Sequence, residues 1–175
     1  MKNREGLLVV DVQNAMFAEE PPVYLGEEVA ERIARLLHKA RAAGTPVVFI
    51  RHTEDEGEFA EGTDTWQIHS AVAPLPGETI LQKRTSDSFY ETGLEDKLKE
   101  LGVSKLTIAG MQTEYCINAT CRRAAELGYN PTLVGDGHST FDESGETARQ
   151  IIDRHNVELG DAGVRLKRAE EIEFV

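Results

Sequence analysis

Residues 106–128 have the sequence LTIAGMQTEYCINATCRRAAELG, and the fold of the chain is organised around this stretch. Its first part, residues 106–109, is a short β-rich run that stops at Gly110, where the chain can turn. Helix-type sequence resumes at about residue 115 and continues to residue 128. The stretch therefore predicts a strand, a tight loop and a helix, with Cys116 in the first turn of the helix.

Cys116 is a candidate nucleophile because of this position. Unpaired backbone N–H groups and the positive end of the helix dipole favour a thiolate at a helix start. The alternative is a buried structural cysteine, which is the more frequent fate of a lone thiol. The second cysteine, Cys121, lies about 140° further around the helix axis, so no disulfide is expected between them. We expect Cys121 to be apolar packing on the buried side of the helix.

The sequence before this stretch predicts parallel strands. Residues 6–10 form an apolar run that ends in Asp11, residues 27–43 have helical spacing of apolar side chains, and residues 46–50 form a second apolar run. Strand, helix and strand in this order indicate a parallel sheet with a right-handed crossover. A third strand is expected at residues 79–82, directly before Lys83.

The rest of the chain continues the same alternation. A helix that closes at Gly102 precedes the strand of residues 106–109, a fifth strand is expected at residues 130–134, and a last helix follows near Thr147. A short strand near Val164 completes the sheet. We therefore predict a three-layer α/β fold, an open, Rossmann-like parallel sheet of about six strands with helices on both faces.

Length and charge restrict the classes of partner. A chain of 175 residues predicts one domain, residues 1–175, and a formal charge of −12 argues against nucleic acid or an anionic membrane as partner. The apolar run near the N-terminus, residues 7–10, is too short for a signal peptide or a membrane span. We expect a cytoplasmic protein that acts on a small molecule.

Residues 54–78 are the one long segment without clear periodicity. A loop of this length is usually functional, so we expect a lid or a subunit contact, with a short helix around residues 65–71. Its apolar residues Trp66, Ile68 and Val72 are difficult for a monomer to cover, which predicts a homo-oligomer, a dimer or a tetramer.

Three residues suited to chemistry share one position in the predicted fold. Asp11, Lys83 and Cys116 each follow a separate strand, and open α/β sheets place their sites at the carboxyl ends of the strands. Alone, Asp11 is expected to cap a loop and Lys83 to be a solvated amine. Together, an acid, a cation and a thiol are sufficient for covalent amide hydrolysis.

Loops at the same edge are expected to form the wall of a substrate pocket. The predicted substrate-binding residues are Gln13, Phe17, His52, Trp66, Phe89, Tyr90 and Tyr115. For Phe89 and Tyr115 a core or interface position is equally expected, and for His52 a hydrogen-bonded structural histidine is the alternative. The Gly-Asp-Gly at residues 135–137 completes no phosphate-binding motif, which disfavours a nucleotide-binding module.

Four motifs, in this order along the chain, resemble the isochorismatase-like cysteine hydrolases. They are LLVVDVQNAMF around Asp11, ILQKRTSDSF around Lys83, GMQTEYCINATCRRAAELGY around Cys116 and VGDGHST after the fifth strand. The resemblance implies a six-stranded parallel sheet, an Asp-Lys-Cys triad, frequent oligomers and a cis peptide bond between Met111 and Gln112. The form of the Cys116 motif is most similar to the amide-cleaving group of the family.

This resemblance implies a cysteine hydrolase that cleaves the C–N bond of a small amide or lactam through a thioester. The backbone N–H groups of Gln112 and Cys116 would hold the oxyanion. Nicotinamidases carry a D-x-H metal motif where this chain has Arg51-His52-Thr53, so no metal and no cofactor are expected. The alternatives are a vinyl ether hydrolase of the isochorismatase type and a catalytically silent interaction protein.

Overall fold

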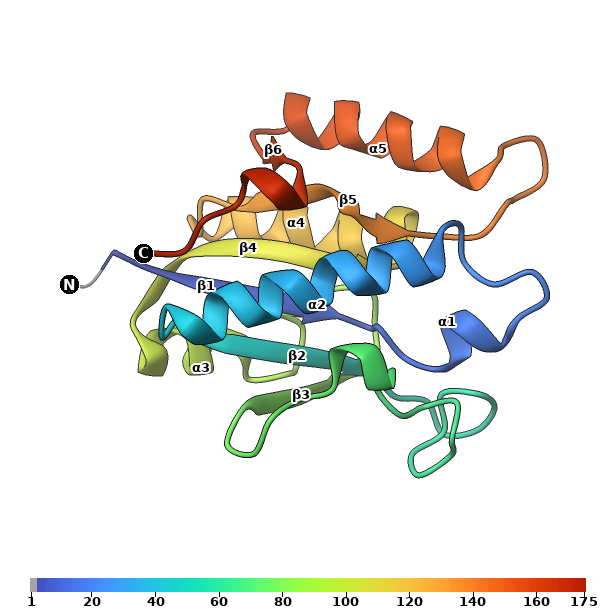
Figure 1. Ribbon diagram of the computed structural model, residues 1–175, viewed down its shortest axis with the longest axis horizontal. Coiled ribbons are helices and arrows are strands. Elements are labelled where there is room, and N and C mark those ends of the chain that lie inside the picture. The colour runs from blue at the N-terminus through green and yellow to red at the C-terminus, as the bar shows by residue number, and fades with distance from the viewer. Residues whose placement is uncertain (1–2) are drawn as a thin grey trace.

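The structure, a computed structural model, describes residues 3–175 and has a parallel sheet between two helical layers (Figure 1). Across these residues the strands are β1 (Arg4–Val10), β2 (Val47–His52), β3 (Thr79–Lys83), β4 (Val103–Met111), β5 (Thr132–Ser139) and β6 (Arg165–Lys167). Their order in the sheet is β3-β2-β1-β4-β5-β6, and every neighbouring pair is parallel. The predicted open α/β sheet is confirmed.

Helices cover both faces of this sheet. The helical elements are α1 (Ala15–Ala18), α2 (Gly26–Ala42), α3 (Leu94–Leu101), α4 (Asn118–Glu126), α5 (Ala148–Asp161), and the short turns Ser70–Val72, Thr113–Ile117 and Ala169–Glu171. In Figure 1, α2 lies across the near face and α3 and α4 lie on the far face. The start of α5 is fixed by Thr147, whose side chain accepts the N–H of Gln150 in a capping box.

Strand β1 shows why a continuous apolar run was needed. Leu7 and Val9 belong to the core beneath α2, whereas Leu8 and Val10 belong to the core beneath α3 and α4. Successive side chains of a strand point to opposite faces, so a strand covered by helices on both sides must be apolar at every position. Truncating one such leucine to alanine typically costs about 2–5 kcal/mol.

Several element boundaries differ from the predicted ones. Gly110 does not end β4: it lies inside the strand with φ of 135°, and a Cβ there would sit 1.9 Å from the carbonyl oxygen of Val10. Glycine is therefore required by the close approach of β1 and β4, and reading it as a strand stop was wrong. Strand β5 continues to Ser139, and a one-turn helix, α1, occupies residues expected to form a loop.

Residues 54–78 fold back on the rest of the chain. Within residues 3–175 their only helical turn is the 3₁₀ turn at Ser70–Val72, so the expected helix at 65–71 is misplaced. Trp66 and Val72 are 6% and 1% exposed, and Ile68 packs against the core beneath α2. Because the chain itself covers these side chains, they give no reason for an oligomer, whose existence stays a prediction.

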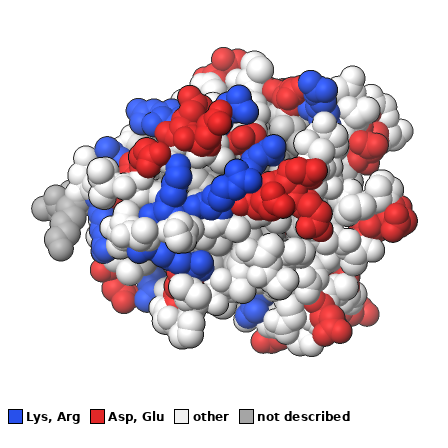
Figure 2. Space-filling model, viewed as in Figure 1, with Lys and Arg blue, Asp and Glu red and all other residues white. Residues whose placement is uncertain are grey.

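Charged side chains on the face of α2 are mixed in sign (Figure 2). The basic residues of α2 reach acidic ones, as in the contacts of Arg32 with Asp136 at 3.7 Å and of Lys39 with Glu173 at 3.1 Å. Such exposed pairs contribute little to stability. Among the residues from 3 to 175, no helix has the length and apolar character needed to cross a membrane.

Candidate active site

The structure brings the three predicted residues Asp11, Lys83 and Cys116 to one edge of the sheet. Asp11 follows β1, Lys83 ends β3, and Cys116 lies in the π-helical turn Thr113–Ile117 between β4 and α4. Strands β1 and β4 are neighbours at the point where the strand order reverses. The chain leaves neighbouring strands in opposite directions there, which opens a crevice at the carboxyl ends.

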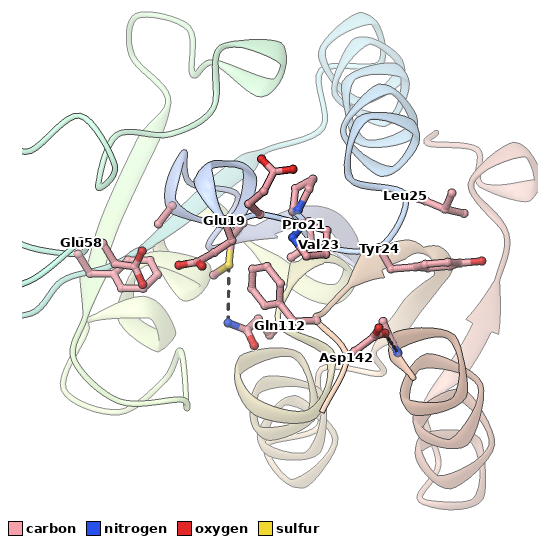
Figure 3. A pocket seen from close by; sticks show the side chains of 15 residues that line it. Glu19, Pro21, Val23, Tyr24, Leu25, Glu58, Gln112 and Asp142 are labelled. Atoms are coloured by element: carbon pink, nitrogen blue, oxygen red, sulfur yellow. Dashed lines mark hydrogen bonds between the residues drawn. The ribbon is translucent and has the colours of Figure 1, made fainter. Parts of the chain in front are cut away.

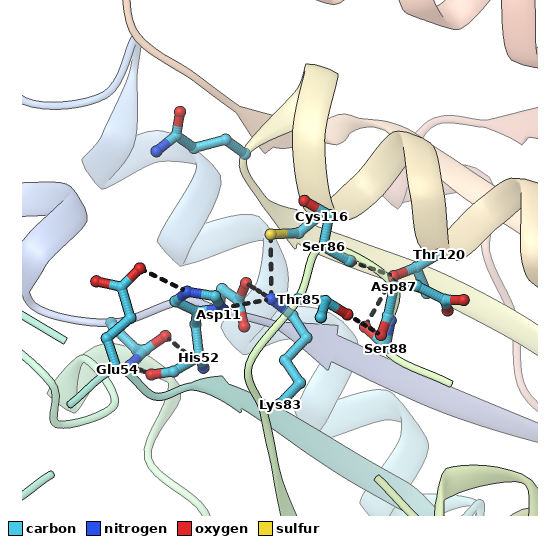
Figure 4. A network of polar contacts seen from close by, with 12 residues as sticks. Asp11, His52, Glu54, Lys83, Thr85, Ser86, Asp87, Ser88, Cys116 and Thr120 are labelled. Atoms are coloured by element: carbon cyan, nitrogen blue, oxygen red, sulfur yellow. Dashed lines mark hydrogen bonds and ion pairs between the residues drawn. The ribbon is translucent and has the colours of Figure 1, made fainter. Parts of the chain in front are cut away.

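Lys83 is the centre of a buried polar cluster (Figure 4). Its Nζ lies 2.7 Å from Oδ2 of Asp11, 3.1 Å from Sγ of Cys116 and 3.0 Å from Nδ1 of His52. The side chains of Lys83 and Asp11 are 0% and 1% exposed, whereas Cys116 is half-buried. A buried charge of this kind is retained only with close partners, and Lys83 has three.

Asp11 keeps one carboxylate oxygen free. Both of its oxygens are buried without a hydrogen bond of regular geometry in residues 3–175, but Oδ2 forms the 2.7 Å ion pair with Lys83 Nζ and Oδ1 has no such contact. The backbone of Asp11 is left-handed, with φ of 51°, and its N–H donates to the carbonyl oxygen of Ile50 at 2.9 Å. An unpaired buried oxygen and an uncommon backbone conformation at the same residue are typical of a functional position, because both carry a free-energy cost.

The charges of this cluster are set by burial and by the Asp11–Lys83 pair. Burial is the largest cause of a Cys116 pKa raised to about 12, the charge of Asp11 adds to it, and Lys83 opposes it. Cys116 is therefore a protonated thiol at neutral pH, and the thiolate expected from its position at a helix start is wrong. Burial lowers the pKa of Lys83, but Asp11 and Cys116 offset this, and the Lys83 pKa lies above its ordinary value.

The turn that carries Cys116 is held from its other side by a neutral cluster. Thr113 Oγ1 lies 2.8 Å from Nδ1 of His138, and Nε2 of His138 lies 2.8 Å from Oδ1 of Asn156. Burial lowers the pKa of His138 to about 4, so the ring is uncharged at neutral pH. His138 carries no predicted role, because the GDGHS segment resembled a loop; in the structure it is the end of β5.

Gln112 joins β4 to this turn. The peptide bond between Met111 and Gln112 is cis, as the resemblance implied. The carbonyl oxygen of Gln112 accepts the N–H groups of Tyr115 and Ile117 at 3.2 and 3.1 Å. Among the backbone hydrogen bonds outside helices and strands in residues 3–175, none is donated by the N–H of Gln112.

Two residues predicted to line the pocket, Gln13 and Trp66, are held by hydrogen bonds within the protein, and their substrate-binding roles stay predictions. The amide of Gln13 donates to the carbonyl oxygens of His52 and Trp66 at 2.9 and 2.8 Å and accepts the N–H of His52 at 3.0 Å. The indole of Trp66 donates to Thr53 at 3.0 Å, and the Arg51 guanidinium lies 3.6 Å above its ring. These contacts join the loops after β1 and β2.

The remaining predicted aromatic residues lie in different surroundings, and Phe89 packs against the core beneath α3 and α4, which is the alternative expected for it. The Phe17 ring contacts His69, and the Phe89 ring stacks on Tyr129, with ring centres 4.1 and 5.7 Å apart respectively. The others are more exposed: Tyr90 is 52% exposed, and Tyr115 is 48% exposed and donates its hydroxyl to Glu143 at 2.6 Å. Their substrate-binding roles stay predictions.

A cavity of about 680 Å³ is lined in part by Gln112 (Figure 3), whereas Asp11, Lys83 and Cys116 are not among its lining residues. Two of its lining residues connect it to the site: Gln112 through its position before the Cys116 turn, and Phe59 through an edge contact with the His52 ring at 5.3 Å between centres. The cavity has apolar walls formed by loops, and its lining includes Met16, Val23, Tyr24, Phe59 and Phe141.

The charges at this cavity are of one sign. Its lining contains Glu19, Glu20, Glu58 and Asp142 and, among the residues that the structure describes, no lysine or arginine. Burial is the largest cause of a raised Glu58 pKa, and the charge of Glu19 adds to it. None of the seven side chains predicted to bind substrate lines this cavity, because it is built from loops whose proximity the sequence does not reveal.

Within residues 3–175, no three histidine, cysteine, aspartate or glutamate side chains are placed to hold a metal ion. Independence from metal stays a prediction, because it concerns activity.

Comparison with known proteins gives consistent matches. The isochorismatase domain family model matches residues 5–154. Streptothricin hydrolase of Streptomyces noursei is 35% identical over 98% of this chain, but this chain spans only 65% of that protein's length. Maleamate amidohydrolase of Pseudomonas putida is 31% identical over 78% of this chain and 74% of its own. A crystal structure of an isochorismatase hydrolase from Oleispira antarctica has a TM-score of 0.91 and 34% identity, covering 98% of this chain and 96% of that one.

Proposed function

The chain belongs to the isochorismatase family of hydrolases, and we propose that it cleaves the C–N bond of a small amide or lactam through a thioester on Cys116. The observation that carries the proposal is the position of Lys83 Nζ, 2.7 Å from the Asp11 carboxylate and 3.1 Å from Cys116 Sγ. Two relatives with hydrolase names, one of them an amidohydrolase, support the reaction class. The proposal treats residues 1–175 as one hydrolase domain.

In the resting state Cys116 is a neutral thiol, because its pKa is about 12. Asp11 acts as the general base and takes the Sγ proton on its free oxygen, Oδ1. The thiolate is formed beside the Lys83 ammonium, which stabilises it electrostatically. In this proposal the proton moves from Cys116 to Asp11 when substrate is bound, and the thiolate that forms attacks the substrate.

The thiolate then attacks the carbonyl carbon, and the carbonyl oxygen becomes an oxyanion. The backbone N–H groups of Gln112 and Cys116 donate to it, and losing one such donor typically costs about 3–4 kcal/mol of transition-state stabilisation. As the C–N bond breaks, Asp11 returns its proton to the departing nitrogen. Amine and thioester are the products of this half-reaction.

Water completes the cycle. Asp11, now a carboxylate again, takes a proton from the water that attacks the thioester carbon. The C–S bond breaks, Cys116 recovers a proton through Asp11, and the carboxylic acid leaves. Besides water and substrate, the proposed steps use the side chains of Asp11, Lys83 and Cys116 and the backbone N–H groups of Gln112 and Cys116.

The cavity beside Gln112 is the proposed place of the substrate. Its volume of about 680 Å³ is in the range of small-molecule sites, and its apolar walls suit the carbon skeleton of an amide. Carboxylates without a lysine or arginine among the lining residues favour a neutral or positively charged substrate over an anionic one.

A panel of primary amides, secondary amides and lactams, screened with intact-protein mass spectrometry at short reaction times, tests the proposal. We expect an acyl adduct on Cys116 for the true substrate, present in a Cys121→Ala variant and absent in Cys116→Ala. An amide that Cys116→Ala hydrolyses as fast as the wild type contradicts the thioester. A substrate that proves to be a vinyl ether contradicts the reaction class, and a chain that turns over no member of either class is a silent scaffold.

A further inference from the structure

Lys83 has a third close partner besides Asp11 and Cys116. An ammonium group has three N–H bonds, and the third acceptor around Nζ is Nδ1 of His52, at 3.0 Å (Figure 4). His52 is the last residue of β2, which pairs with β3 so that His52 stands opposite Lys83 in the register. Adjacent strand ends therefore bring the two side chains together.

This contact sets the hydrogen-bond roles of the two nitrogens of the His52 ring. Lys83 can only donate, so Nδ1 must be the unprotonated nitrogen of a neutral imidazole. The ring proton is then on Nε2, which lies 3.2 Å from Oε1 of Glu54 and donates to it. The tautomer is thus determined by a donor on one side and an acceptor on the other.

The ring is also held in place as a whole. Gln13 pairs with both the N–H and the carbonyl oxygen of His52, at 3.0 and 2.9 Å. The ring meets the edge of Phe59, and its side chain is only 16% exposed. A histidine so constrained presents Nδ1 at one position.

We infer that His52 is a positioning residue of the proposed hydrolysis, which holds the Lys83 ammonium between Asp11 and Cys116 by accepting its third N–H bond. Without this acceptor, the long Lys83 side chain loses one of three anchors, and its ammonium can turn away from Sγ. The inference rests on the proposed function for its role in turnover, but the contact itself does not. It replaces the expectation that His52 binds substrate.

Two substitutions of His52 separate the roles of its nitrogens. In asparagine, Oδ1 is bonded to Cγ, as Nδ1 is in histidine, so His52→Asn can still accept the Lys83 N–H bond. In glutamine, the amide lies one bond further out, near the place of Nε2, so His52→Gln loses that acceptor while it remains polar. Glu54→Gln is the matched control, because an amide oxygen still accepts the Nε2 proton.

The first readout requires no substrate. The rate of iodoacetamide alkylation of Cys116, mapped by peptide mass spectrometry at pH 8–9, reports how well Lys83 supports the thiolate. We expect His52→Gln to be slower than wild type by about tenfold, the effect of one lost hydrogen bond to a charged group, and His52→Asn and Glu54→Gln to stay within about threefold. Buried Cys121 remains unlabelled and serves as the internal control for folding.

The second readout is turnover of whichever amide the panel identifies. A positioning role predicts that kcat falls in His52→Gln by a similar factor for every substrate, with KM unchanged. Equal alkylation rates in all variants, or a rise in KM alone, overturns the inference and leaves the thioester mechanism standing. The expected order of alkylation rates without any amide turnover supports the positioning of Lys83 and counts against the proposed function instead. Should His52→Gln label Cys121 and so prove misfolded, His52→Leu, which also lacks the acceptor, must show the same loss.

Discussion

Two buried polar clusters lie on opposite sides of the turn that carries Cys116, and they are built differently. On one side, Lys83 and Asp11 form an ion pair at 2.7 Å with His52 as a third partner. On the other, His138 bridges Thr113 and Asn156 at 2.8 Å each, and burial lowers its pKa to about 4. The first cluster is charged and the second is neutral.

The difference supports the proposal that the charged cluster serves chemistry. Neutral hydrogen bonds are sufficient to hold a turn, and they avoid the desolvation cost of several kcal/mol per buried ion. A buried ion pair could be replaced by apolar side chains of similar volume with little loss of stability, so its presence calls for another reason. Beside the half-buried Cys116 thiol and an unpaired carboxylate oxygen, we propose that this reason is proton transfer.

The largest expected effect is on turnover, in the charged cluster alone. Cys116→Ala, Asp11→Asn and Lys83→Met should each reduce kcat by about 10³-fold or more, since a triad acts as a unit, and pairs of these changes should cost little more than one. Steady-state kinetics on the amide found in the screen measures this. His138→Asn, which can still bond Thr113, should keep most of the activity; a loss equal to that of Lys83→Met would erase the distinction between the clusters.

The next effect is on stability. Here a second substitution in the cluster should restore stability that the first one removes. Lys83→Met leaves the Asp11 carboxylate buried and unpaired, which should lower the free energy of unfolding by about 3–5 kcal/mol. Adding Asp11→Leu removes that charge and should restore most of the loss. Urea denaturation of the two single variants and the double variant gives the three values. A double variant less stable than Lys83→Met would show that the intact ion pair stabilises the fold, and that the loss in Lys83→Met is not due to the unpaired Asp11 charge.

In the neutral cluster we expect a dependence of stability on pH. The pKa of His138 falls from 6.5 to about 4 on folding, so the unfolded state binds more protons between these values. The contribution of His138 to the free energy of unfolding is fully present above pH 6.5. It decreases as the pH falls towards 4, by about 3 kcal/mol in total. Urea denaturation at several pH values, with His138→Asn for comparison, isolates this contribution. Identical slopes for both proteins would mean that His138 does not titrate as its burial requires.

The charged cluster could be located from sequence because its members follow strands. Apolar runs identify buried strands well, and in a parallel sheet the residue after each run lies at the same edge, which is why Asp11, Lys83 and Cys116 were found together. His52 also ends a strand, but its partner was not evident, since the pairing of β2 with β3 follows only from the assembled sheet. The position of His138 was also not predicted, because β5 continues through two glycines that resemble a loop in the sequence.

Properties that depend on several segments could not be predicted. The pKa of Cys116 reverses the expectation from its helix position, because burial by surrounding elements and the charge of Asp11 outweigh the local backbone. The cavity is similar: residues near positions 16–25, 58–59 and 141–142 meet only in the folded chain. Its carboxylates therefore give the last and smallest expected effect, which concerns substrate charge.

Glu19 and Glu58 enter the cavity wall from separate loops, with no lysine or arginine among the described lining residues to neutralise them (Figure 3). Replacing both by glutamine should raise KM for a cationic amide by about two- to fivefold, the size expected for exposed charges, and leave KM for a neutral analogue unchanged. Added salt should weaken the preference in the wild type and have a smaller effect on the variant, which keeps Glu20 and Asp142 in the cavity wall. Glu31→Gln, on the exposed face of α2, is the control for removing a surface carboxylate away from the cavity, although it changes the net charge by one and the double variant by two. An equal change in KM for both substrates would mean that these carboxylates shape the cavity and do not select charge, whereas no change for either would place the substrate outside it.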